Sequence, residues 1–149
     1  MSIHSYARIW LHLAWSTLAR ESVLSEDASL ELERHLVAYG ADRGITMRSV
    51  YAGADHAHAV IELPTNLTVE QVLQLFKGES SHWLNLRSIL SQALHWGRGY
   101  GAFSVSEELL EEVIAFIESQ KEYHTHTSFE EEFRELVRKH GLAWSGWSS

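Results

Sequence analysis

Two histidines that share one face of an expected strand are the first residues here whose spacing suggests chemistry. They occur in the segment His56-Ala57-His58, inside a β-prone run. Because side chains alternate across a strand, the two imidazoles project from the same face, about 7 Å apart along the chain. Two imidazoles placed in this way can bind one divalent metal ion. The same spacing also arises by chance in a protein with ten histidines, so the pair alone leaves both interpretations open.

A glutamine within an apolar helical stripe is a candidate third ligand. Gln120 shares one expected helix face with four residues at steps of three and four, namely Leu109, Val113, Phe116 and Tyr123. In such a stripe a glutamine is either solvated near the helix end or an oxygen ligand directed at a site. Two imidazoles and an amide oxygen leave coordination positions open for water and phosphate oxygens. This donor set suits Mg²⁺ or Mn²⁺ better than a structural zinc ion.

The elements that would position these residues follow the order β-α-β-β-α-β, with two further helices. The expected strands cover 6–17, 45–51, 56–63 and 102–105, and the expected helices cover 25–44, 68–84, 106–124 and 128–141. Gly78 is expected to interrupt the second helix. The order predicts an α+β, ferredoxin-like fold: an antiparallel four-stranded sheet with helices on one face, plus two C-terminal helices.

The composition predicts a single domain. The chain has 149 residues, of which 45% are hydrophobic and one is proline, so we expect one domain over 1–149, with a core over about 6–141 and a tail over 142–149. The absence of cysteine excludes disulfides, thiolate zinc sites and a cysteine nucleophile. The start of the sequence lacks the pattern of a signal peptide, and no apolar run approaches the roughly 18 residues of a membrane span. These features predict a cytoplasmic protein with no membrane partner.

The net charge of −8 argues against a broad nucleic-acid-binding surface, because affinity for phosphates comes largely from Lys and Arg. The charge is uneven, since residues 107–140 hold ten acidic and four basic residues. The glutamate run from Glu130 to Glu132 is interpreted as a solvated helix face. Any surface that faces phosphates is therefore expected in the first part of the chain. The candidate contacts are the basic residues Arg8, Arg48, Lys77, Arg87 and Arg98, with Trp10 on an open strand face and Tyr100 in the glycine loop 97–101 as stacking platforms.

Several motifs in a fixed order resemble a known family. They are His56-Ala57-His58, Lys-Gly-Glu-Ser-Ser at 77–81, Gly-Tyr-Gly-Ala-Phe-Ser-Val-Ser at 99–106, Phe-Ile-Glu-Ser-Gln at 116–120 and Phe-Glu-Glu-Glu-Phe at 129–133. Together they span about residues 6–141. In this combination the sequence resembles the IS200-like insertion-sequence transposases, which have a His-hydrophobic-His (HUH) motif and a single catalytic tyrosine.

The resemblance implies a site, a cofactor and partners. In that family two histidines and a helical glutamine bind a divalent metal ion that polarises a phosphate of single-stranded DNA, and a tyrosine one turn before the glutamine attacks it. The resemblance thus implies His56, His58 and Gln120 as ligands of Mg²⁺ or Mn²⁺. It also implies single-stranded or hairpin DNA as the partner, and a homodimer in which the nucleophile helix packs against the partner's histidines.

The sequence departs from the family pattern at Phe116, which stands where the family has its tyrosine, four residues before Gln120. Phenylalanine cannot form a phosphotyrosine, and loss of the nucleophile in a covalent enzyme costs on the order of 10⁶ in rate. The sequence therefore predicts a transposase-like protein that binds DNA and metal and has lost covalent cleavage. Two alternatives are a metal-dependent nuclease that uses water or Tyr123, and a dimeric ferredoxin-like module that binds no nucleic acid. The acidic charge favours the second alternative.

Overall fold

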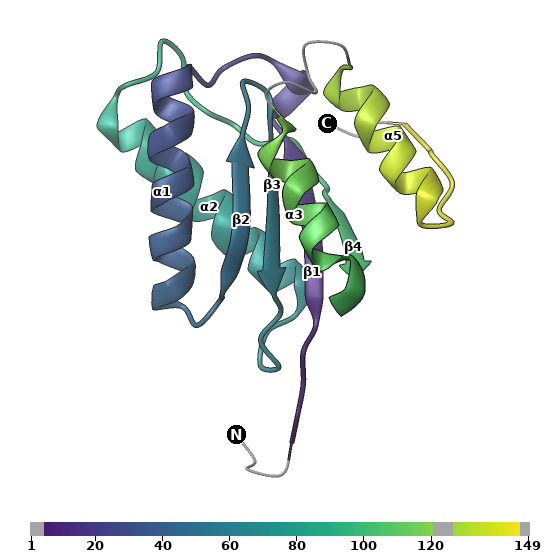
Figure 1. Ribbon diagram of the computed structural model, residues 1–149. Coiled ribbons are helices and arrows are strands. Elements are labelled where there is room, and N and C mark those ends of the chain that lie inside the picture. Colours follow the sequence, from purple (N-terminus) through teal and green to yellow (C-terminus); the bar gives the residue numbers. More distant parts are fainter. Residues whose placement is uncertain (1–4, 121–126, 147–149) are drawn as a thin grey trace.

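A four-stranded antiparallel sheet organises the chain. The computed structural model describes residues 5–120 and 127–146. The sheet order is β2-β3-β1-β4, which confirms the predicted α+β fold (Figure 1). The first strand is shorter than the expected 6–17, because residues 5–9 lie outside the strand ladder. The strands are β1 (Trp10–Ser16), β2 (Met47–Ala52), β3 (His56–Glu62) and β4 (Gly101–Val105).

The helices begin where the sequence places capping residues. The Ser25 hydroxyl accepts a hydrogen bond from a backbone amide of the first turn of α1, and Thr68 and Gln71 form a capping box at the start of α2. The prediction that Gly78 interrupts α2 is wrong. A single glycine costs a helix only about 1 kcal/mol, which the packed face of this long helix offsets. The helices are α1 (Glu26–Asp42), α2 (Val69–Arg87), α3 (Leu110–Glu118) and α5 (Phe129–Lys139), with short 3₁₀ turns at Leu18–Arg20 and Glu107–Leu109.

The two faces of the sheet carry different layers. On one face, Ala59 of β3 belongs to the main core with Leu32 of α1 and Phe76 of α2. On the opposite face, Val60 packs against Ile117 of α3, which lies in front of the sheet in Figure 1. The first two helices thus share one face, as predicted, and the first of the two C-terminal helices covers the other. None of the helices within the described residues is long and apolar enough to cross a membrane.

A candidate metal centre beside α3 and α5

His56 and His58 lie on the face of β3 that α3 covers. Strand alternation places Ala57 in the core on the opposite face, as expected. The exposed fractions of the two histidines are 2% and 0%, and their ring centroids lie 5.2 Å apart. Gly53 in the β2–β3 turn comes so close that a Cβ there would lie 2.9 Å from Cε1 of His56. The backbone turn therefore helps to fix the position of this imidazole.

Hydrogen bonds orient both imidazoles. Nδ1 of His56 lies 2.7 Å from a carboxylate oxygen of Asp55, and Nδ1 of His58 lies 2.8 Å from Nε2 of His12. Burial, and after it the charge of His58, lowers the pKa of His12 to about 3, so His12 is neutral at physiological pH. A neutral His12 can share one hydrogen bond with Nδ1 of His58, and the direction of that bond is tied to the tautomer of His58. Partners of this kind orient metal-binding histidines and set their tautomers.

Glu132 is the site residue that the sequence interpretation missed. The expectation of a solvated face is wrong for it, because Glu132 is 2% exposed and its carboxylate lies 2.6 Å from Nε2 of His58. The spacing of Glu132 from the apolar residues of the same helix could have indicated that it is buried. Glu132 follows Phe129 by three residues and precedes Leu136 by four, so it lies on the apolar stripe of α5. His56, His58 and Glu132 bring three possible ligand atoms within 4.8 Å of one another.

Gln120 is completely buried just beyond the end of α3. Its amide Nε2 donates a hydrogen bond of 3.4 Å to the carbonyl oxygen of Phe116, and no donor within the described residues reaches its Oε1. A buried oxygen without a hydrogen bond costs roughly 1–3 kcal/mol. A divalent cation would satisfy this atom, so the donor set fits a metal site. Tyr123, the alternative nucleophile, lies outside the described residues.

Phe116 lies beside the histidines of its own chain. Its ring centroid is 6.2 Å from that of His58 and 6.3 Å from that of His12. It also lines a pocket of about 380 Å³ between α3, β4 and α5. Within the single chain, Ile114 and Ile117 bury the core-facing side of α3 against its own sheet.

Three of the predicted DNA contacts meet at the far end of the sheet. The guanidinium carbons of Arg8 and Arg48 lie 5.0 and 5.5 Å from the ring centroid of Trp10, and each arginine also pairs with a glutamate. Trp10 is 5% exposed, and its Nε1 donates to the carboxylate of Glu107. The expectation that Trp10 lies on an open strand face is wrong, since the segment before α3 and the two arginines cover it.

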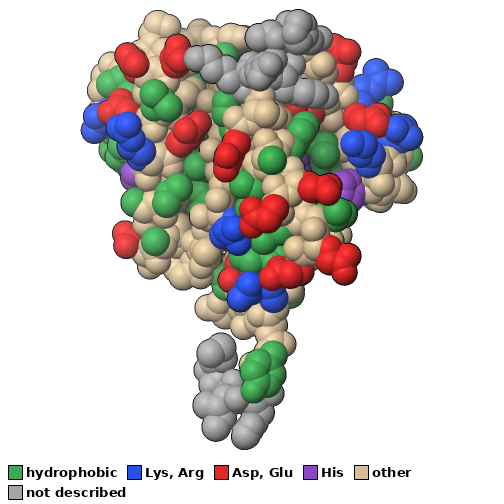
Figure 2. Space-filling model, viewed as in Figure 1, with side chains coloured by type: hydrophobic (Ala, Val, Ile, Leu, Met, Phe, Trp, Pro, Cys, Tyr) green, Lys and Arg blue, Asp and Glu red, His purple; other side chains and the backbone are tan. Residues whose placement is uncertain are grey.

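Two more of the predicted DNA contacts, Lys77 and Arg87, already interact with other residues of the chain. Arg87 pairs with Glu31 of α1, on the face of the sheet away from the histidines. Nζ of Lys77 donates to the carbonyl oxygens of Gly97 and Gly99 at 2.8 and 3.0 Å, so this lysine holds the glycine loop. Burial lowers the pKa of Lys77. Among the described residues on the face seen in Figure 2, Lys and Arg side chains lie beside Asp and Glu and form no continuous basic surface.

Arg98 and Tyr100 are exposed in the glycine loop, next to the histidines. The amide of Gly97 donates to the carbonyl of Ser16, which pairs with His56 across the sheet, so the loop lies at the histidine end. Within residues 5–120 and 127–146, no ion pair involves Arg98. Both side chains line a small pocket of about 150 Å³ with residues of β1 and α5. Of the predicted contacts, these two are the best placed to meet a ligand at the site.

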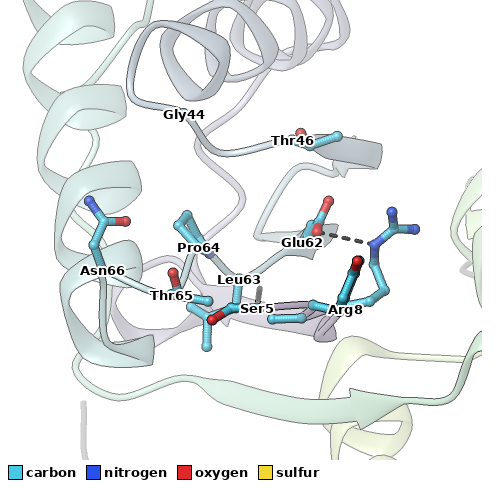
Figure 3. A pocket seen from close by; sticks show the side chains of 11 residues that line it. Ser5, Arg8, Gly44, Thr46, Glu62, Leu63, Pro64, Thr65 and Asn66 are labelled. Carbon is cyan, nitrogen blue, oxygen red and sulfur yellow. Dashed lines mark hydrogen bonds and ion pairs between the residues drawn. The ribbon is translucent and has the colours of Figure 1, made fainter. Parts of the chain in front are cut away.

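A larger pocket, of about 980 Å³, lies at the opposite end of the sheet. The segments 5–8 and 62–66 line most of it, and the ion pair between Arg8 and Glu62 crosses it (Figure 3). Glu62 pairs with Trp10 across the sheet, six positions along β1 from the pairing of Ser16 with His56. This pocket is therefore separate from the histidine site.

Comparison with known proteins identifies the family. The family described as "Transposase IS200 like" matches residues 5–120. The chain belongs to the IS200-like transposase family. The histidine pair, Phe116 and Gln120 lie inside the matched region, whereas Glu132 lies beyond it. A search of curated proteins finds no match.

Two solved structures share the fold of this IS200-like transposase. A candidate transposase from Deinococcus radiodurans R1 has a TM-score of 0.65 and 20% identity, over 80% of this chain and 96% of that one. A REP-associated tyrosine transposase bound to a REP hairpin has a TM-score of 0.58 and 16% identity, over 98% of this chain and 92% of that one.

Proposed function

We propose that this IS200-like transposase binds single-stranded or hairpin DNA at the histidine site and holds Mg²⁺ or Mn²⁺ there with His56, His58 and Gln120. The observation that carries the proposal is Oε1 of Gln120, which is buried and has no hydrogen-bond donor within the described residues. Gln120 follows α3, the helix that covers the histidine pair in this family member. A bound divalent ion would supply the charge that polarises a phosphodiester. Asp55 and His12 would hold the two imidazoles in the binding orientation.

Phe116 takes the place of the nucleophile in this proposal. Its ring lies beside His58 and borders an open pocket, as a nucleophile's would. It has no hydroxyl, so the side chain packs without forming a bond to phosphorus. The protein therefore binds DNA without the covalent step of transposition, in the cytoplasm that its lack of cysteine suits.

Binding through unpaired bases, rather than through a basic surface, follows from the charges. Most of the predicted cationic contacts already pair with glutamates or carbonyls, which leaves Arg98 and Tyr100 at the site. An exposed aromatic ring contributes about 1–3 kcal/mol for each base stacked on it. Hairpin DNA with unpaired flanks offers such bases, and linear duplex does not.

We expect the protein to bind hairpins with unpaired flanks more tightly than linear duplex of the same sequence. Tyr100→Ala should weaken hairpin binding roughly tenfold through lost stacking. Arg98→Ala should lower the slope of log affinity against log salt by about 0.7, the value for one phosphate contact. Fluorescence anisotropy over a salt series measures both. Arg87→Ala serves as the control because Arg87 lies on the far face. Equal affinity for hairpin and duplex would contradict binding through unpaired bases, and no binding to a broad hairpin library at low salt would favour the module that binds no nucleic acid.

The proposal includes a homodimer, which the family resemblance implies. With the core-facing side of α3 packed in its own chain, the contact would use sheet edges and exposed apolar residues near that helix, such as Leu109 in the preceding 3₁₀ turn, which is 51% exposed. We expect sedimentation velocity to detect dimer at tens of micromolar, well above a nanomolar-to-micromolar dissociation constant. Leu109→Glu should shift the protein toward monomer. Monomer alone in the unaltered protein would contradict the dimer.

A further inference from the structure

We infer that Glu132 is an additional protein ligand of the metal ion, so that α5 docks over the histidine pair as part of the metal site. The inference rests on the metal site proposed above and extends it beyond the region that the family match covers. It assigns a role to a helix that neither the His-hydrophobic-His motif nor the nucleophile position explains.

The first step is geometric. A strand supplies two imidazoles and a separate helix supplies a carboxylate, and their possible ligand atoms all lie within 4.8 Å of one another. Ligands of one divalent ion lie about 2.0–2.2 Å from it, and therefore at most about 4.4 Å from one another, which is close to the spread of these three atoms. All three residues are buried, with exposed fractions of 2% for His56, 0% for His58 and 2% for Glu132. Buried ligand atoms at such spacing form a preorganised binding site.

The second step concerns charge. A buried carboxylate costs several kcal/mol in lost hydration unless a positive charge compensates it. Glu132 nevertheless occurs on an apolar stripe, where a hydrophobic residue would pack at no such cost. Its carboxylate contacts His58, which is itself one of the proposed ligands. A divalent ion held between His56, His58 and Glu132 would compensate the carboxylate directly.

Aromatic contacts at both ends of α5 hold the helix at this position. Phe129 stacks on His56 with ring centroids 4.3 Å apart and an interplanar angle of 16°. His140, at the other end of the helix, stacks on Phe103 of β4 at 4.5 Å. A capping box at Ser128 and Glu131 fixes the start of the helix, which places Glu132, in its first turn, at the His58 side chain. The docked position of α5 is therefore also the position in which Glu132 reaches the two histidines.

The test compares Mn²⁺ binding by Glu132→Gln and Glu130→Gln. Glu130 is exposed on the first turn of the same helix, so its variant matches the change in charge without touching the site. By calorimetry we expect Glu132→Gln to weaken Mn²⁺ binding at least tenfold, since even outer partners of metal ligands are worth 10–100-fold. Glu130→Gln should bind as the unaltered protein does. Unchanged or tighter binding by Glu132→Gln would overturn the inference, because the carboxylate would then be an internal partner of His58 that the metal displaces.

A second measurement uses the unaltered chain and needs no variant to fold. Trypsin cleaves after Arg134, Arg138 and Lys139 in α5, so the rate of cleavage there reports undocking of the helix. Saturating Mn²⁺ should slow this cleavage several-fold, and a chelator should reverse the effect. Bound Mn²⁺ with an unchanged cleavage rate would also overturn the inference and leave the metal site intact. Absence of Mn²⁺ binding by the unaltered protein would instead remove the proposed metal site as well.

Discussion

Phe116→Tyr is expected to turn a protein that forms no covalent DNA adduct into one that does. The new hydroxyl would attack a phosphorus atom of a bound single strand, the bond to the 3′ oxygen would break, and that oxygen would leave as a 3′ hydroxyl with the proton. The product is a 5′-phosphotyrosine. The gain should be on the order of 10⁶ in rate, the size of the effect of a nucleophile in a covalent enzyme. A labelled hairpin with unpaired flanks, incubated with Mg²⁺ or Mn²⁺ and run on a denaturing gel, detects the adduct.

Two variants make this result specific to position 116. Phe133→Tyr adds the same hydroxyl on α5, where the Phe133 ring packs 5.6 Å from that of Phe129, and should form no adduct. Phe116→Tyr combined with His56→Ala should also form none. Cleavage by the unaltered protein would favour a nuclease that uses water or Tyr123, and Tyr123→Phe would decide between these. Absence of adduct from Phe116→Tyr on hairpins that it binds would show that position 116 is not the nucleophile's place.

The parts of the fold that depend on local pattern could be predicted from the sequence. Alternation in His56-Ala57-His58 placed both imidazoles on one face, because in a strand the period is two regardless of what covers the sheet. Capping residues such as Ser25, Thr68 and Ser128 marked three helix starts for an equally local reason. The helical stripe likewise singled out Gln120, which the structure shows to be fully buried.

The errors concern what covers each surface, which depends on contacts between distant segments. Trp10 alternates as a strand residue should, yet Arg8, Arg48 and Glu107 close over it, and Glu107 comes from 97 residues along the chain. The Glu130–Glu132 run resembles a solvated face until α5 docks beside a strand 74 residues away. A count of basic residues likewise does not tell which of them can contact DNA, because Lys77 already donates hydrogen bonds to carbonyl oxygens of the glycine loop.

Loss of the metal is the second large effect that we expect. His56→Ala should weaken Mn²⁺ binding at least about 100-fold, beyond the effect of an outer partner of a ligand. Gln120→Ala should weaken it as well, because Mn²⁺ favours carbonyl oxygens as ligands. Calorimetric titration of Mn²⁺ into each purified variant measures the affinity. Unchanged affinity in both variants would remove the metal site altogether.

His35→Ala is the control that separates ligation from packing. His35 stacks on Trp83 with ring centroids 4.0 Å apart, and its Nε2 donates a hydrogen bond of 2.9 Å to the carboxylate of Glu79. His56 has the same two kinds of contact, a stacked ring in Phe129 and a carboxylate in Asp55. The His35 side chain is 20% exposed and that of His56 is 3% exposed, so each variant is compared with itself, with and without Mn²⁺. Only the protein with His56 removed should lose the stabilisation that Mn²⁺ adds, which by mass action is about 2.7 kcal/mol at one hundred times the dissociation constant. Equal stabilisation of the two variants by Mn²⁺ would place the ion elsewhere.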